Sequence, residues 1–379
     1  MGSEQVIKKI LSLADVSING NRPWDIKVND KKLYGRILSG GSLALGESYM
    51  DGWWDCKSID QFIYKVLKAK LNKRILSVKH LALMIFSFLK ARIINLQSKS
   101  RAFEIGKKHY DLGNELYKNM LDKRLMYSCG YWKNARNLNE AQEAKIDLIC
   151  RKLKLKKGMA LLDIGCGWGG LAKYAAEKYK VKVIGITVSK EQAEFANKAC
   201  KNLPVKIILD DYRKLLSQRY LKAFDRIVSV GMFEHVGPKN YRNFMKIAHY
   251  CLKDKGIFLL HTIGGNKSVR KGEQWTSKYI FPNSVLPSAK QIAKASEGVF
   301  VLEDWHNFGS DYDPTLMAWY SNFTKNWNKI KMSGKYDERF YRMWVYYLLS
   351  CAGSFRVRNV QLWQIVFSKN LYDKYESVR

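Results

Sequence analysis

Acidic residues are scarce in this sequence. It contains 34 Asp and Glu against 66 Lys and Arg, so its 379 residues carry a formal net charge of +32. An excess of this size predicts a polyanionic partner, either nucleic acid or the surface of an anionic membrane. The shortage is most marked in residues 61–103, which contain no Asp or Glu at all.

Cysteines and long apolar runs are also few. The seven cysteines form no C-x-x-C pair and no metal-ligand spacing, which predicts a reduced, cytosolic protein with no metal site. The first ten residues lack the apolar core of a signal peptide, and no run is long enough to cross a bilayer. We therefore expect a cytoplasmic protein that is soluble or attached to a membrane surface.

The acid-free stretch has the composition of an interfacial membrane contact. Basic residues surround an apolar run, residues 80–89, that is about half as long as a membrane-spanning helix. Lysines can bind lipid phosphates while leucines and phenylalanines enter the acyl boundary. The alternative is an ordinary core helix with a basic, solvated flank. The hypothesis depends on Lys65, Lys68, Lys70, Lys73 and Arg74, which we call the basic cluster, and on Leu83, Ile85, Phe86 and Phe88.

A glycine-rich loop follows the apolar run at residues 161–164. Gly165, Gly167 and Gly170 would let the backbone approach a ligand that a Cβ would block. Their spacing also satisfies the dinucleotide fingerprint, which is weak on its own, and a simple packing turn is a further alternative. Asp163 favours a cationic ligand, and the next expected strand ends without the ribose-binding acid of nicotinamide sites. S-adenosylmethionine, a sulfonium cation without phosphate, therefore suits this loop better.

Strand and helix patterns alternate from Gly158 onward. The expected strands are residues 159–163, 181–188, 205–209, 226–230 and 256–261, with helices between most of them. This alternation predicts an α/β fold with a doubly wound sheet. Ligands of such sheets bind at the carboxyl ends of the strands, so the residues that follow each strand are the candidates for a site.

Polar residues follow the third, fourth and fifth expected strands. Asp211 and Tyr212 suit adenine, because a carboxylate can accept from the exocyclic amine and a tyrosine can stack. Glu234 and His261 follow the next two strands, where a satisfied polar pair is the alternative interpretation. The fourth strand is not followed by the Asn/Asp-Pro-Pro-Tyr motif of nucleic-acid methyltransferases. Nucleic acid is therefore the less favoured partner.

Longer motifs occur along almost the whole chain. They lie at residues 46–54, 109–114, 163–170, 229–241, 259–264, 279–283, 303–309 and 316–320. These motifs resemble those of the bacterial cyclopropane-fatty-acyl-phospholipid synthase family. The resemblance implies a class I S-adenosylmethionine-dependent methyltransferase, which adds the methyl carbon of its donor to a cis double bond of a phospholipid acyl chain. A proton must then leave the new methyl group so that a cyclopropane can close.

The resemblance implies a bound bicarbonate for this proton removal, since a free carboxylate beside the carbocation could itself be alkylated. Its implied ligands are Cys129, Glu234, His261, Ile263 and Tyr312. Glu234 would accept the bicarbonate hydroxyl proton, Tyr312 and His261 would donate, and Ile263 would contribute main-chain groups. Aromatic rings could stabilise the carbocation, and the candidates are Tyr127, Phe233 and Tyr312.

The resemblance also implies a set of donor-binding residues. Thr187 and Gln192 would lie near the ribose, and Asp211 and Tyr212 near the adenine. With Asp163, which the loop sequence itself suggested, the full expected set is Tyr127, Ser128, Asp163, Gly165, Gly167, Trp168, Thr187, Gln192, Asp211 and Tyr212.

The expected domains are an N-terminal lipid- or membrane-binding domain at residues 1–88, a linker at 89–110 and a catalytic domain at 111–379. The long N-terminal domain favours a phospholipid over a carrier-bound acyl chain. We further expect a homodimer that attaches to the inner face of the cytoplasmic membrane. Its partners would be anionic phospholipids with unsaturated acyl chains, and no nucleic acid.

Two alternatives remain at this stage. One is a lipid methyltransferase of the same superfamily that acts on a carrier-bound chain or adds a methyl group without closing the ring. The other is a non-catalytic, basic membrane-binding protein built on a degenerate methyltransferase domain. The second predicts the loss of a loop glycine or of the Glu234–His261 pair, and the sequence keeps both.

Overall fold

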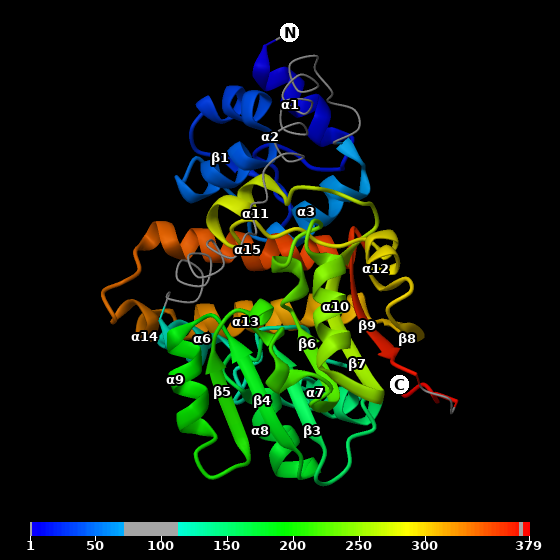
Figure 1. The fold of residues 1–379 in the computed structure, drawn as a ribbon. Helices are drawn as coiled ribbons and strands as arrows, with labels where there is room; N and C mark the ends of the chain where they lie inside the picture. Colours follow the sequence, from blue (N-terminus) through cyan, green and yellow to red (C-terminus); the bar gives the residue numbers. More distant parts are fainter. Residues whose placement is uncertain (1, 72–112, 371–373) are drawn as a thin grey trace. The chain divides into compact units, whose positions relative to one another are not determined.

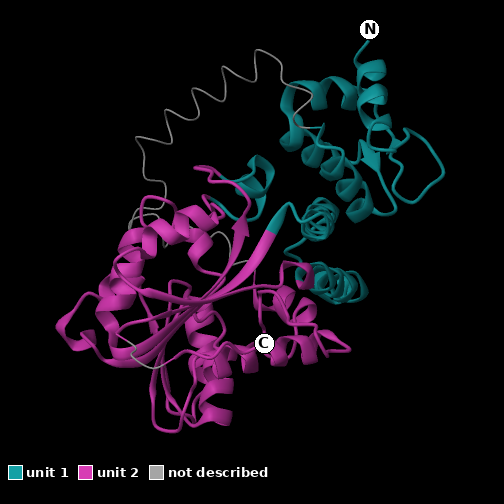
Figure 2. Ribbon diagram, turned by 90° about the vertical axis from the view of Figure 1, so that its right-hand side faces the viewer, with its two compact units in different colours: residues 1–94, 272–282, 312–360 teal, residues 95–271, 283–311, 361–379 magenta. Residues whose placement is uncertain are grey.

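The computed structural model describes residues 2–71, 113–370 and 374–379 (Figure 1). These residues form two compact units, coloured separately in Figure 2. Unit 1 contains residues 2–71, 272–282 and 312–360, and unit 2 contains the remaining described residues. The expected domain limits at 88 and 110 lie outside the described residues and stay a prediction. So do Lys73, Arg74, Leu83, Ile85, Phe86 and Phe88.

Within the described residues, unit 2 is built on a seven-stranded sheet with the order β5-β4-β3-β6-β7-β9-β8. Neighbouring strands from β5 to β7 pair in parallel, whereas β8 and β9 pair antiparallel. The expected α/β fold with a doubly wound sheet is thereby confirmed. The strands are β3 Ala160–Ile164, β4 Lys182–Thr187, β5 Val205–Leu209, β6 Phe224–Val230, β7 Leu252–Gly265, β8 Val301–Asn307 and β9 Val360–Ser368.

Two strands of this sheet, β8 and β9, were not among the expected ones. In β9 every residue after Val360 is buried, so the strand lacks the alternation of a half-exposed strand. In β8 the only buried residue is Asp304. The sequence analysis thus missed both strands, although residues 360–367 are rich in the β-branched and aromatic types that strands favour.

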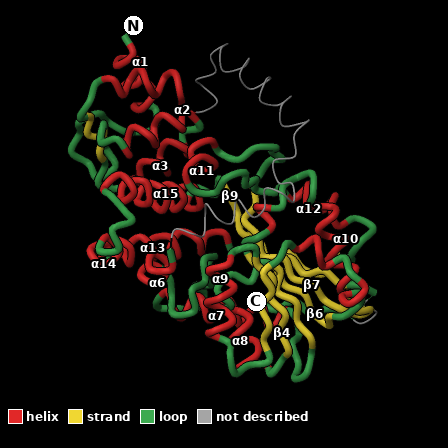
Figure 3. The backbone as a smooth tube through the Cα atoms, turned by 60° about the vertical axis from the view of Figure 1, so that its left-hand side comes forward, coloured by secondary structure: helices red, strands yellow, loops and turns green. Residues whose placement is uncertain are grey.

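Helices cover both faces of the sheet in unit 2 (Figure 3). Successive strand residues point to opposite faces, and Leu161 and Leu162 accordingly belong to different buried clusters. One cluster includes residues of α10 and α12, and the other includes residues of α7, α8 and α9. The helices are α6 Asn114–Met120, α7 Leu138–Lys152, α8 Gly170–Tyr179, α9 Lys190–Ala199, α10 Tyr241–Cys251 and α12 Ala289–Ser296.

Unit 1 is mainly helical and combines segments that are far apart in the sequence. Trp54 packs against Tyr49, Phe62 and Tyr346 in its core, and Arg356 pairs with Asp60. Strands β1 Lys27–Val28 and β2 Trp54–Asp55 pair antiparallel. The helices are α1 Ser3–Ser12, α2 Lys32–Met50, α3 Ile59–Lys68, α11 Gln274–Tyr279, α13 Tyr312–Lys325, α14 Trp327–Lys331 and α15 Glu338–Arg356.

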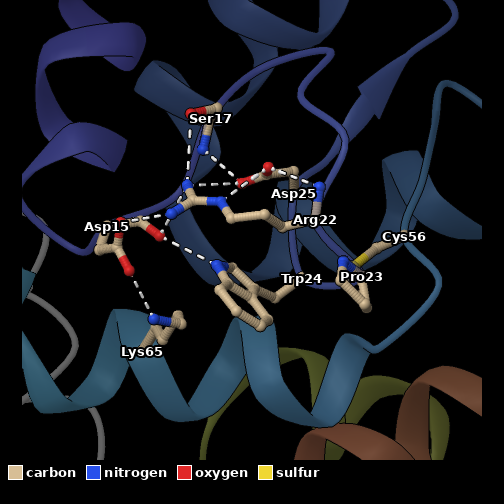
Figure 4. A network of polar contacts seen from close by, with 8 residues as sticks. All are labelled: Asp15, Ser17, Arg22, Pro23, Trp24, Asp25, Cys56 and Lys65. Atoms are coloured by element: carbon tan, nitrogen blue, oxygen red, sulfur yellow. Dashed lines mark hydrogen bonds and ion pairs between the residues drawn. The ribbon is translucent and has the colours of Figure 1, made fainter.

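A polar network in unit 1 involves one member of the basic cluster (Figure 4). The Lys65 Nζ lies 2.7 Å from Asp15 Oδ2 and 4.4 Å from the centre of the Trp24 ring. Arg22 contacts the same Asp15 and also Asp25. Lys65 is thus held by protein groups. No helix in the described part of the chain is both long and apolar enough to cross a membrane.

Candidate active site

A pocket lies in unit 2 at the carboxyl ends of β3, β4, β5 and β6. It is lined by the loop after β3, by the ends of β4 and β6, and by residues that follow β5. The structure brings together here each of the expected donor-site residues: Tyr127, Ser128, Asp163, Gly165, Gly167, Trp168, Thr187, Gln192, Asp211 and Tyr212. Their convergence follows from the parallel strands, whose carboxyl ends share one edge of the sheet.

The glycine-rich loop has a left-handed backbone at Gly165 (φ 86°) and Gly167 (φ 54°). A Cβ on Gly165 would come within 2.7 Å of the Met232 Cβ, whereas one on Gly167 would meet no protein atom within 4 Å. Gly165 therefore serves the packing of the loop, and Gly167 leaves space on the pocket side. Trp168 is fixed by its indole N–H, which donates to Asn114 Oδ1 at 2.8 Å.

The acidic end of the pocket contains one residue that sequence analysis missed. Arg213 lines the pocket and donates to both oxygens of Asp211, at 2.7 and 2.8 Å. Tyr212 is buried, and its hydroxyl oxygen has no hydrogen-bond partner among the described residues. Elsewhere in the pocket lining, the Thr187 hydroxyl donates to Gln192 Oε1 at 2.9 Å. The pocket thus contains a carboxylate that is already paired with Arg213, whereas the Tyr212 hydroxyl oxygen is buried.

A buried charged pair lies beneath the loop. Burial raises the pKa of Asp163 to about 7, and nearby Lys145 opposes that shift. Burial lowers the pKa of Lys145 to about 8, and its Nζ donates to Ser128 Oγ at 2.7 Å. Gln142 also holds this segment by donating to the Ser128 carbonyl at 2.7 Å. Sequence analysis missed Lys145 and Gln142. Their only signal was a polar side chain at buried positions of the helix α7.

Glu234 and His261 are buried after β6 and within β7. The Ile263 amide donates to Glu234 Oε1 at 2.6 Å, so this amide fixes the carboxylate. Glu234 Oε2 and His261 Nε2 are buried and have no hydrogen-bond partner among the described residues. Burial raises the pKa of Glu234 to about 7, and the bond from Ile263 opposes this shift. Each of these two side chains therefore has one buried polar atom without a partner in the described part of the chain.

The other predicted catalytic residues occupy different surroundings. Cys129 is fully buried in unit 2, and its thiol donates to the Gly130 carbonyl at 3.1 Å. Tyr312 lies in unit 1, where its ring packs against Phe355 at 4.4 Å. Phe233 is stacked on Tyr241 at 4.3 Å, so one of its faces is covered. The roles of Cys129 and Tyr312 stay predictions.

Known proteins resemble this chain over most of its length. Residues 97–365 match the family model described as mycolic acid cyclopropane synthetase. The chain is 53% identical over 367 residues to the cyclopropane-fatty-acyl-phospholipid synthase of Escherichia coli (strain K12), which covers 97% of this chain and 94% of that protein. It is 32% identical over 301 residues to sphingolipid C9-methyltransferase A of Emericella nidulans, covering 76% of this chain and 57% of that protein.

Solved structures show the same likeness. The mycolic acid cyclopropane synthase CmaA1, complexed with SAH and CTAB, aligns with a TM-score of 0.64 at 32% identity. The alignment covers 70% of this chain and 98% of that one. The expected class I methyltransferase fold is thereby confirmed.

Proposed function

Because this chain belongs to the mycolic acid cyclopropane synthetase family, we propose that it transfers the methyl carbon of S-adenosylmethionine to phospholipid acyl chains and closes a cyclopropane ring. The observation that carries this proposal is the likeness to the Escherichia coli phospholipid enzyme over 97% of the chain. That likeness includes most of the residues before position 97, where the family model begins. The N-terminal residues thus favour a phospholipid substrate.

The pocket of unit 2 is the proposed site for the methyl donor. The open space beside Gly167 and the convergence of the expected donor-site residues on this pocket support this assignment. The sulfonium of the donor is a cation, and Asp163, before the glycine loop, supplies a carboxyl group that lines the pocket. The similar synthase solved with SAH supports the same ligand class.

The reaction makes three demands on the protein. Methyl transfer breaks the sulfur–carbon bond, forms a bond to one alkene carbon and leaves a carbocation on the other. Loss of one proton from the new methyl group then provides the electron pair that closes the ring. The site must therefore bind a cation, keep water from a carbocation and accept one proton.

Glu234 and His261 are proposed to serve the proton-removal step. Their unpartnered atoms, Oε2 and Nε2, fit a small anion that both accepts and donates hydrogen bonds. Bicarbonate has that chemistry, and when bound it supplies a base that is too weakly nucleophilic to be alkylated readily. Glu234 would receive its hydroxyl proton, and the Ile263 amide holds that carboxylate in place. Cys129, which is also buried in unit 2, is a further proposed ligand, and the role of Tyr312 stays a prediction from the sequence.

We also propose attachment to anionic membranes through the acid-free stretch. The unsaturated acyl chains lie within a bilayer, and exposing each methylene to water costs about 0.8 kcal/mol. An enzyme on the membrane surface avoids part of that cost. Within the basic cluster, Lys65 already pairs with Asp15, so the proposal depends on the other members.

A turnover assay on vesicles tests the function directly. The protein is incubated with labelled S-adenosylmethionine and vesicles of a phospholipid with cis-unsaturated chains, and the acyl chains are then analysed by mass spectrometry. The proposal predicts a cyclopropane, which fragments differently from a methyl-branched chain. A methyl branch would instead support the alternative of methylation without ring closure, for which the sphingolipid C9-methyltransferase is the precedent. No labelled lipid would contradict both.

A further inference from the structure

Gln364 is a buried amide on β9, beside the proposed catalytic histidine. Strands β7 and β9 are neighbours in the sheet, and both Gln364 and His261 are almost completely inaccessible to solvent. The Gln364 Nε2 lies 3.4 Å from His261 Nδ1. Sequence analysis missed this glutamine, because β9 was not among the expected strands and Gln364 lies over a hundred positions from His261.

The amide determines where the histidine carries its proton. In this orientation of the amide, its nitrogen donates because it has no lone pair to accept with, and His261 Nδ1 accepts. The Gln364 Oε1 has no hydrogen-bond partner among the described residues. A neutral imidazole that accepts through Nδ1 carries its single proton on Nε2. The ring is neutral, because burial holds the pKa of His261 well below its ordinary value and the charges of Lys145 and Lys152 act in the same direction.

We propose that Gln364 is a positioning residue that fixes His261 as an Nε2–H hydrogen-bond donor toward the anion of the site. This inference rests on the proposed function, in which His261 donates to bicarbonate. The opposite tautomer would turn an Nε2 lone pair toward the anion, and the two would repel each other. With Gln364 in place, His261 donates and the free Oε2 of Glu234 accepts. This pairing matches an anion that carries one hydroxyl group.

The surroundings of the ring support a role for the amide in orienting it. Phe308 packs edge-on against His261, with ring centres 5.9 Å apart. On the far side of Gln364, His306 is its register partner on β8, and the His306 Nδ1 lies 3.1 Å from the buried Lys152 Nζ. Gln364 is therefore the neutral group between two histidines. A carboxylate at this place would instead favour a proton on Nδ1 or a charged ring.

The tautomer can be read directly from the full-length protein. Histidines are labelled with ¹⁵N, and the imidazole signals of His261 are assigned by their loss in a His261→Asn variant. The parent should show a protonated Nε2 and an unprotonated Nδ1. Two variants change the amide: Gln364→Met removes the donor at similar size, and Gln364→Glu replaces it with an acceptor. Gln361→Met is the matched control, since Gln361 is a buried amide of the same strand that bonds to Asn266.

The expected results separate positioning from simple stabilisation. Gln364→Met should lower kcat on vesicles on the order of 10- to 100-fold, as loss of an orienting partner does at other functional histidines, with donor affinity unchanged. Gln364→Glu should lower kcat at least as much and move the proton to Nδ1. Gln361→Met should alter neither the tautomer nor kcat by more than about twofold.

Several outcomes would overturn the inference. A parent spectrum with the proton on Nδ1 would do so even if every Gln364 variant failed to fold. Parent-like kcat in folded Gln364→Met would also contradict it. A parent protein that binds donor but forms no cyclopropane would refute the proposed function instead. In that case an Nε2–H that is lost in Gln364→Glu would still support the assignment of Gln364.

Discussion

At the scale of single residues, the proposed chemistry centres on a buried carboxyl group, that of Glu234. Glu234 is buried, its Oε1 is held by the Ile263 amide, and its Oε2 has no partner among the described residues. An unpaired buried polar atom costs folding free energy, and such atoms are concentrated at functional sites. Glu234 is therefore the first residue to test.

Replacing Glu234 with Ala should lower kcat on the order of a hundredfold or more, because general-base assistance contributes about that much. Donor binding should persist, since Glu234 does not line the donor pocket. Vesicle turnover and calorimetric titration with S-adenosylmethionine measure the two effects. Glu194→Gln, at an exposed carboxylate of α9, is the control. Near-parental turnover in Glu234→Ala would remove Glu234 from the mechanism.

The same carboxyl group should make stability depend on pH. Its pKa is about 7 in the folded state against 4.5 as the ordinary value, so between these pH values the folded state binds more protons than the unfolded state. Stability therefore falls as pH rises through this window. Relative to the parent, Glu234→Gln should gain free energy of unfolding between pH 5 and pH 8, by up to about 3 kcal/mol. Denaturant titrations at both pH values measure this gain, and a pH-independent difference would contradict the raised pKa.

At the scale of elements, two glycines of the loop between β3 and α8 have different roles. Gly165 is required for packing, and Gly167 is proposed to leave space for the ligand. Gly165 faces Met232, and Gly167 faces space that no protein atom fills. Both have positive φ, so any side chain adds backbone strain of about 1–2 kcal/mol. Only the Gly165 site adds a steric clash to that strain.

Gly167→Val should abolish detectable donor binding while the protein stays folded, because the new side chain occupies the ligand space. Gly165→Ala should instead lose more stability, since its Cβ would overlap Met232. Calorimetry with S-adenosylmethionine and thermal unfolding distinguish the two variants. Unchanged donor affinity in folded Gly167→Val would place the donor elsewhere.

At the scale of the whole molecule, the net charge of +32 is the property to explain. Charges near an anionic surface contribute roughly 1 kcal/mol each and are screened by salt. In the described part of the basic cluster, Lys65 pairs with Asp15, whereas Lys73 and Arg74 lie outside the described residues. The remaining cluster is the proposed contact with lipid.

Replacing Lys68, Lys70, Lys73 and Arg74 with Gln should weaken co-sedimentation with anionic vesicles at least tenfold. Parent binding should rise with the anionic lipid fraction and fall with salt. The matched control removes four exposed lysines of unit 2, namely Lys156, Lys157, Lys178 and Lys201. Equal losses in the two variants would mean that net charge alone, rather than this cluster, drives binding.

The sequence by itself determined the glycine loop, five parallel strands and the residues that follow them. These could be predicted because parallel strands place their carboxyl ends on one edge, so Asp163, Thr187 and Asp211 had to converge. Only the tertiary structure revealed Lys145 beneath the loop and Gln364 beside His261. It also joined residues 312–360 to the N-terminal residues in unit 1. The physical reason is that the role of a buried polar side chain depends on which groups it contacts. Those groups are distant in the sequence, and only the folded chain brings them within contact distance.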